Sequence, residues 1–189
     1  FACALRINIP TGKDSLSMTQ KYGDKKVVSP GTVIISAGAE VKDVKKTVSP
    51  VVQAKDSSIY YVDFSNDELK LGGSALSQVL NKVGSDVPTV KSSEYFAKAF
   101  EAVQKLVSKK KLLAMHDISA GGMITALLEM VFANVKGGLD VNLDAFTSDD
   151  MIKVLFAENP AVLIQVANKN EESVLALLAE YGVKAVKVA

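Results

Sequence analysis

The sequence is poor in residues that build several common kinds of site. Its single cysteine, Cys3, excludes an internal disulfide and suits a reducing, cytoplasmic location. Its single histidine, His116, excludes a metal centre made of several histidines. No apolar run approaches the roughly 20 residues of a membrane-spanning helix. A formal net charge of +1 gives no electrostatic case for nucleic acid or an anionic membrane as a partner.

What remains is the composition of an ordinary globular protein. Apolar residues make up 48% and charged residues 23% of the 189 residues, which is enough to bury a sizeable core. The first residues, Phe-Ala-Cys-Ala-Leu, lack an initiator Met and the charged region of a signal peptide. We therefore expect a piece of a longer polypeptide, in which Cys3 is a buried side chain and not a nucleophile.

Hydrophobic patterning predicts an α+β fold in two parts. A boundary is expected between Ser49 and Ser58, with 1–52 as the end of one domain and 53–189 as a second domain. A polar turn at 22–26 joins two strand-like runs. Strands are expected at 4–9, 32–37, 58–64, 112–115, 139–143, 161–167 and 183–188. Helices are expected at 75–82, 94–109, 122–133, 149–155 and 171–181.

Two of these segments carry clear predictions of burial. The run at 32–37 is rich in β-branched residues, which favours a buried strand. The helix at 94–109 is strongly amphipathic, and its apolar residues recur at helical spacing on one face. Those residues are Phe96, Phe100, Val103, Leu106 and Val107.

The turn between the strand at 112–115 and the helix at 122–133 is the most chemically suggestive stretch. It reads Met115-His116-Asp117-Ile118-Ser119-Ala120-Gly121-Gly122. A helix N-terminus offers unpaired N–H groups, and glycines let a ligand approach that backbone, which suits phosphate. Asp117 is then the natural Mg²⁺ ligand, and Ser119 either caps the helix or binds a phosphate oxygen. The alternative is an ordinary strand-to-helix turn.

Three further features offer weaker cases. Gly12-Lys13-Asp14-Ser15 combines a glycine, an ammonium group suited to phosphate, a carboxylate and a hydroxyl, or is a solvated turn. Leu71-Gly72-Gly73-Ser74 is a second glycine–serine turn at a helix start. Glu158 is either a second carboxylate near Asp117 or an exposed side chain. We interpret His116, at the end of a strand, as structural.

These turns, taken in order, resemble the phosphoribosylformylglycinamidine synthase family. The matching stretches are Ile9–Met18, Leu71–Leu76, His116–Gly122, Leu127–Met130 and Leu155–Glu158. The likeness covers essentially the whole chain and points to the second synthetase half of the long, single-chain form, within the aminoimidazole ribonucleotide synthetase-like superfamily. It implies that 1–52 is the end of an N-terminal-type domain. It also implies that 53–189 is a complete C-terminal-type domain with a mixed sheet flanked by helices.

The resemblance implies an ATP-dependent ligase of purine biosynthesis. The family converts formylglycinamide ribonucleotide, glutamine and ATP to the amidine, glutamate, ADP and phosphate. In its reaction ATP phosphorylates the formamide oxygen, ammonia displaces the phosphate, and the protein positions the reactants and neutralises charge with Mg²⁺ and cations. The implied partners are the nucleotide, formylglycinamide ribonucleotide and the rest of the polypeptide, with its first synthetase half and glutaminase domain. The chain alone is expected to be inactive.

The likeness also assigns individual residues. Gly12 and Lys13 lie near ATP and its metal, with Lys13 on phosphate because a charged lysine does not ligate a metal, and Ser15 lies near the substrate. Asp117 ligates Mg²⁺ and Ser119 contacts a nucleotide at an auxiliary site, where the nucleotide is held and not turned over. Two departures from the family pattern are Ala120 and Asn159-Pro160, and the second leaves the role of Glu158 open.

Two other functions fit the same residues. One is a binding module, a pseudo-symmetric half that holds an inert nucleotide and supports its paired half. The other is a sibling synthetase for aminoimidazole ribonucleotide or selenophosphate. The Gly-Lys-Asp-Ser loop and the lack of a reactive cysteine motif argue against the sibling enzymes. Exposed apolar surface and strand edges in a truncated first domain also predict self-association.

Overall fold

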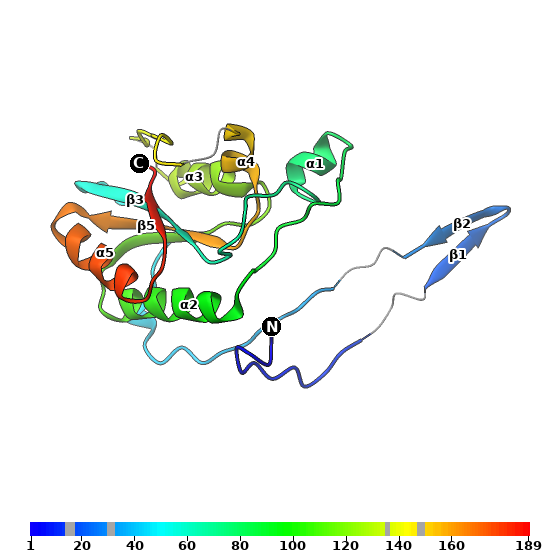
Figure 1. Ribbon diagram of the computed structural model, residues 1–189, viewed down its shortest axis with the longest axis horizontal. Helices are drawn as coiled ribbons and strands as arrows, with labels where there is room; N and C mark the ends of the chain where they lie inside the picture. The colour runs from blue at the N-terminus through cyan, green and yellow to red at the C-terminus, as the bar shows by residue number, and fades with distance from the viewer. Residues whose placement is uncertain (14–17, 30–32, 135–136, 147–149) are drawn as a thin grey trace. The chain divides into compact units, whose positions relative to one another are not determined.

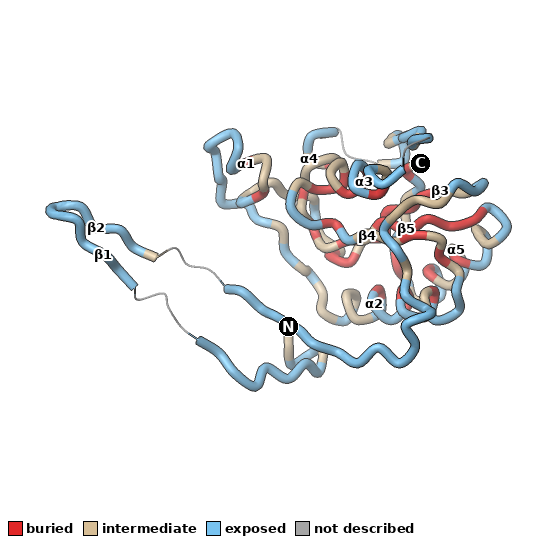
Figure 2. Tube along the Cα trace, turned by 180° about the vertical axis from the view of Figure 1, so that it is seen from behind, coloured by how far each residue is buried: buried red, intermediate tan, exposed pale blue. Residues whose placement is uncertain are grey.

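The computed structural model describes residues 1–13, 18–29, 33–134, 137–146 and 150–189. They form two compact units, Phe1–Val44 and Lys45–Ala189, and a short 3-10 turn, η1 (Val44–Lys46), lies at the division. Figure 2 shows that the buried stretches lie in the sheet and helices of the second unit. The described residues of the first unit are all exposed or intermediate.

The described part of the first unit contains a β-hairpin. Strand β1 (Thr19–Tyr22) pairs antiparallel with β2 (Lys25–Val28), and Tyr22 faces Lys25 across the turn. Gly23, at φ 60°, takes the left-handed conformation that a two-residue hairpin turn favours. The polar turn expected at 22–26 is therefore confirmed.

The strand expected at 4–9 is wrong. Residues 2–6 form a turn, in which the Leu5 N–H donates to the Phe1 carbonyl at 3.1 Å and Arg6 takes a φ of 57°. A strand needs a neighbour to pair its backbone groups, and the described residues of this unit supply none here. Cys3 is exposed in this turn, so its expected burial is also wrong.

The buried strand expected at 32–37 is wrong as well for residues 33–37. These residues belong to no strand, and Ile34 is 86% exposed. A β-branched run favours an extended backbone, but burial depends on a layer that covers it. Within the described part of the first unit no such layer is present.

The second unit is a four-stranded sheet with helices on both faces (Figure 1). Its strands are β3 (Ser57–Asp63), β4 (Leu112–Asp117), β5 (Ala161–Ala167) and β6 (Ala185–Lys187), in the order β4-β5-β3-β6. Its helices are α1 (Ala75–Val79), α2 (Ser93–Ser108), α3 (Gly122–Phe132), α4 (Met151–Phe156) and α5 (Glu171–Glu180), with a 3-10 turn η2 (Asn168–Asn170). The α+β class is confirmed, although the strand pairings among the described residues of this sheet are all antiparallel and the expected mixed sheet is not found there.

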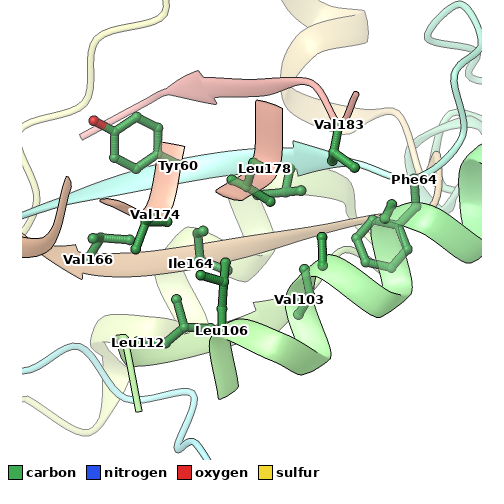
Figure 3. Packing of buried hydrophobic residues seen from close by; sticks show 13 residues of the cluster. Tyr60, Phe64, Val103, Leu106, Leu112, Ile164, Val166, Val174, Leu178 and Val183 are labelled. Atoms are coloured by element: carbon green, nitrogen blue, oxygen red, sulfur yellow. The ribbon is translucent and has the colours of Figure 1, made fainter. Parts of the chain in front are cut away.

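Strand β5 is central because apolar residues cover both of its faces. Ile164 packs in a cluster with α2 and α5, whereas Leu163 packs in a second cluster with α3 and α4. Figure 3 shows the first cluster, where Ile164 lies near Leu106 and Val103 of α2. A strand buried on both faces reads as a continuous apolar run, which explains why the sequence predicts 161–167 without error.

Helix α2 begins at Ser93, one residue before the predicted start, and the Ser92 hydroxyl caps it by accepting the Tyr95 N–H at 3.2 Å. Val103 and Leu106 are buried as expected, but Phe100 is 53% exposed. A helix covers the sheet with only part of its apolar stripe, and Phe100 lies beyond that part.

The strand expected at 139–143 is also wrong, since the described residues there show no ladder pairing.

Candidate functional site

Asp117 is the last residue of strand β4, and a short connecting turn leads from it to the start of α3. The Asp117 side chain is 72% exposed, so its carboxylate is open to a ligand. The neighbouring His116 is mostly buried on the α3 side, with its Nε2 atom 3.3 Å from the Glu129 carboxylate. Its Nδ1 atom lies 2.8 Å from the Asp117 carbonyl oxygen. These contacts give His116 a structural partner on α3, which agrees with the structural interpretation of this residue.

The glycines of this turn serve packing. Gly121 is the N-cap residue of α3 at φ 92°, and no side chain caps the helix there. A Cβ atom on Gly122, which has φ 73°, would lie 2.6 Å from the Phe156 carbonyl carbon. Gly122 therefore lets the start of α3 approach the end of α4 closely. Ser119 is exposed and does not cap α3, so of its two expected roles only the ligand contact remains as a prediction.

Glu158 holds the two glycine turns of the second unit together. Its Oε1 atom accepts the Gly121 N–H at 2.8 Å and the Ala75 N–H at 2.7 Å. The carboxylate thus sits at the N-terminal ends of both α3 and α1, where negative charge is stabilised. Glu158 is partly buried, so the exposed alternative is wrong, and its carboxylate lies against the turn that follows Asp117. The sequence suggested that a phosphate group binds the backbone N–H groups at the start of α3. At Gly121 the Glu158 carboxylate occupies that position instead.

Sequence reasoning missed this bridge because its partners are remote in sequence. Gly121 and Ala75 are 37 and 83 residues from Glu158 along the chain. Capping patterns that a sequence reveals are local, with the cap within a few residues of its helix. The one signal available was a carboxylate just before a strand, and it does not reveal which helix ends will surround it.

The backbone N–H groups of the turn before α1 are likewise occupied by other groups of the chain. The Gly72 N–H donates to the Asp86 carbonyl at 2.8 Å, and the Gly73 N–H donates to the Val83 carbonyl at 2.7 Å. A Cβ atom on Gly72 would lie 2.5 Å from the Asp86 carbonyl oxygen. The Ser74 hydroxyl caps α1 by accepting the Ser77 N–H at 3.2 Å. These glycines therefore bring the loop at 83–86 against the turn.

Asn159, where the sequence departs from the family pattern, is completely buried. Its Oδ1 atom accepts the Lys70 N–H at 3.2 Å, and its Nδ2 atom donates to the Glu68 carbonyl at 2.9 Å. In the same loop, hydrogen bonds from Thr89 and Lys70 lower the pKa of Asp67 to about 2. The residue beside Glu158 thus fixes the loop that leads into the α1 turn.

Gly12 and Lys13 lie in the first unit and are exposed. They line a cavity of about 790 Å³ together with residues 7–11 and 34–38, so the structure brings Gly12 and Lys13 near the exposed β-branched run. Ser15 lies outside the described residues. Ligand contacts at Gly12 and Lys13 remain predictions.

The described side chains around Asp117 do not by themselves form a metal site. In the described part of the chain, no group of three or more His, Cys, Asp or Glu residues is arranged to hold a metal ion. One exposed carboxylate does fit Mg²⁺, which is often held by one or two carboxylates together with phosphate oxygens and water. Among the described helices, none combines the length and the hydrophobicity that a membrane-spanning segment requires.

Comparison with known proteins gives a family and a fold. Residues 57–189 match the family described as "AIR synthase related protein, C-terminal domain". The Thermotoga maritima PurL protein complexed with ATP has a TM-score of 0.57 at 16% sequence identity, over 77% of this chain and 23% of that chain. The same protein complexed with FGAR has a TM-score of 0.55 at 16% identity, over 77% of this chain and 25% of that chain.

A third similar structure is named phosphoribosylformylglycinamidine synthase II from Thermotoga maritima. Its TM-score is 0.57 at 16% identity, over 77% of this chain and 23% of that chain. The match therefore spans about a quarter of the length of these solved structures. At this identity the likeness shows the fold.

Proposed function

This chain belongs to the AIR synthase related family through its C-terminal domain, and we propose that it is part of a phosphoribosylformylglycinamidine synthase. The parent enzyme would convert formylglycinamide ribonucleotide, glutamine and ATP to the amidine, glutamate, ADP and phosphate in the cytoplasm. In this proposal 1–52 is the end of an N-terminal-type domain, and 53–189 is the C-terminal-type domain. A first synthetase half and a glutaminase domain would be supplied by the rest of the polypeptide.

One observation carries the proposal for the second unit. The Asp117 carboxylate is exposed at the end of β4, in a chain of this family, with the exposed Ser119 two residues further on. A carboxylate and a hydroxyl on one rigid turn suit a nucleotide with its cation. The Glu158 carboxylate stabilises this turn by accepting a hydrogen bond from the Gly121 N–H.

The proposed roles of the residues are those that the family resemblance implies, and the chemistry of the side chains suits them. Mg²⁺, when bound, neutralises charge on phosphate oxygens. Asp117 would hold that ion, and the Ser119 hydroxyl would donate to a phosphate oxygen. Gly12 and the Lys13 ammonium group would contact ATP phosphates, and Ser15 would contact the ribonucleotide substrate. The binding groups of the second unit would then hold a nucleotide, and the loop at 12–15 would contact the reactants together with the rest of the enzyme.

Calorimetric titration of the chain with ADP and Mg²⁺ tests this proposal. We expect binding that requires the metal and weakens at least about tenfold in Asp117→Ala, because a carboxylate ligand is lost. Asp56→Ala, which removes another exposed carboxylate of the second unit, is the matched control and should bind like wild type. Equal binding by Asp117→Ala and wild type, or no binding by wild type, would contradict a nucleotide–metal site in this chain.

A further inference from the structure

A second cavity, of about 450 Å³, lies beside the end of β3. It shares no lining residue with the turn at 117–122 and does not include Glu158. Tyr61 and Phe146 line it with aromatic rings whose centroids lie 5.6 Å apart at an interplanar angle of 70°. Leu69 adds apolar surface. The volume falls in the range of about 300–1,000 Å³ that is typical of small-molecule sites.

The Tyr61 hydroxyl is the feature that points to a ligand. The Tyr61 side chain is only 7% exposed and lines the cavity. Its hydroxyl makes no hydrogen bond within the part of the chain that the structure describes, where no fully buried side-chain oxygen lacks a partner. The Tyr61 hydroxyl is therefore accessible from the cavity that its side chain lines. Burial, followed by the nearby Asp63 carboxylate, raises the pKa of Tyr61 well above its usual value. The hydroxyl therefore stays protonated and can donate to an acceptor in the cavity.

Groups of both charges line the same cavity. Lys153 makes no side-chain hydrogen bond or ion pair among the described residues, and Lys184 Nζ lies 3.2 Å from the neutral Asn66 Oδ1 atom. The Glu68 carboxylate is exposed and accepts no hydrogen bond in the described ranges, although its charge acts on the nearby Lys70 ammonium group. The Asp63 carboxylate is already occupied, because its two oxygens accept hydrogen bonds from the turn at 65–66. The cavity thus retains ammonium groups for a carboxylate and a carboxylate for an ammonium group.

We propose that this cavity binds a small zwitterion with an aromatic side chain, namely an α-amino acid. The ligand carboxylate would meet Lys153, Lys184 and the Tyr61 hydroxyl, since charged acceptors form the stronger hydrogen bonds. The ligand ammonium group would meet Glu68. Its ring would pack against Tyr61 and Phe146, which favour edge-to-face contact with a third ring. This site is independent of the nucleotide site proposed at Asp117.

Titration of the full chain with L-phenylalanine, without nucleotide, tests the proposal by calorimetry or ligand-observed NMR. We expect saturable binding in the millimolar range or tighter. Phenethylamine lacks the carboxylate and 3-phenylpropionate lacks the ammonium group, and each should bind at least about tenfold more weakly. Glycine, which lacks the ring, should show no measurable binding. No saturable binding of phenylalanine, or equal binding of any of the three analogues, would overturn the proposal.

Variants then assign the contacts. Tyr61→Phe removes only the hydroxyl and should weaken phenylalanine binding about tenfold while leaving the melting temperature near that of wild type. Lys153→Met should weaken it by a similar factor. Lys169→Met removes an exposed ammonium group that does not line the cavity and should bind like wild type. Wild-type affinity in both Tyr61→Phe and Lys153→Met would contradict the site, whatever the outcome of the Asp117 titration.

Discussion

The two units of the chain differ in what surrounds their apolar residues. In the second unit, β5 lies between two helical layers, and Ile164 is completely buried. In the first unit, Ile34 belongs to a similar β-branched run and is 86% exposed. The difference teaches that apolar, β-branched sequence favours an extended backbone but does not decide burial, because burial depends on layers that are remote in sequence.

The largest effect expected from this contrast is at the two isoleucines. Ile164→Ala should lower the free energy of unfolding by about 2–5 kcal/mol, because it removes buried methyl groups and leaves a cavity. Ile34→Ala is the matched change in the first unit and should stay within about 0.5 kcal/mol of wild type. Urea denaturation followed by circular dichroism measures both. Equal losses at the two positions would show that the first unit buries Ile34.

Two glycines sharpen the contrast with a somewhat smaller effect. Gly122→Ala should destabilise the chain by about 2–4 kcal/mol, because its φ of 73° disfavours a side chain and a Cβ would meet the backbone of Phe156. Gly12→Ala, where nothing lies within 4 Å of the added methyl group, should change stability by less than about 1 kcal/mol. The same denaturation experiment decides. A mild Gly122→Ala would mean that the α3–α4 contact is loose.

The Glu158 bridge comes next in size. Glu158→Ala should cost about 1–3 kcal/mol, since it leaves the N–H groups of Ala75 and Gly121 without their acceptor. Glu158→Gln keeps an acceptor oxygen and should lose less than the alanine variant. Glu180→Ala, at an exposed position on α5, is the control and should be near neutral. Equal losses for the alanine and glutamine variants would place the effect in the charge and not in the hydrogen bonds.

The sequence predicts much of the second unit and little of the first. Strand β5 and helix α5 follow from apolar runs with clear ends, since their partners in the sheet and on its face lie in the same unit. The strands expected at 4–9 and 32–37 follow the same rules and are wrong wherever the structure describes them, at 4–9 and 33–37, because pairing and burial are not local properties. Phe100 shows that burial is not a local property on a helix either. The sequence predicts the bounds of α2 well, but Phe100, expected on its buried face, is exposed.

The candidate site is predictable in its residue types but not in its construction. Asp117 is exposed at the end of β4, as a ligand-binding carboxylate must be. The position of Glu158 was missed, and the sequence left the role of the glycines open between ligand binding and an ordinary turn. Both depend on contacts between segments far apart in sequence. Asp117 and Ser119 as ligand contacts stay predictions until a nucleotide is titrated.

The smallest expected effect is a pH dependence of stability that differs between a carboxyl group of the second unit and one of the first. Hydrogen bonds from Thr89 and Lys70 lower the pKa of Asp67 from 3.8 to about 2. A carboxyl group whose pKa is lower in the folded state stabilises the fold at pH values above its unfolded-state pKa. This contribution is lost as the pH falls through its folded-state pKa. The stability difference between wild type and Asp67→Asn should therefore shrink between about pH 4 and pH 2. Asp24→Asn, in the hairpin turn of the first unit, should show no such trend in urea denaturation. A difference at Asp67 that stays constant with pH would mean that its hydrogen bonds do not depend on its charge.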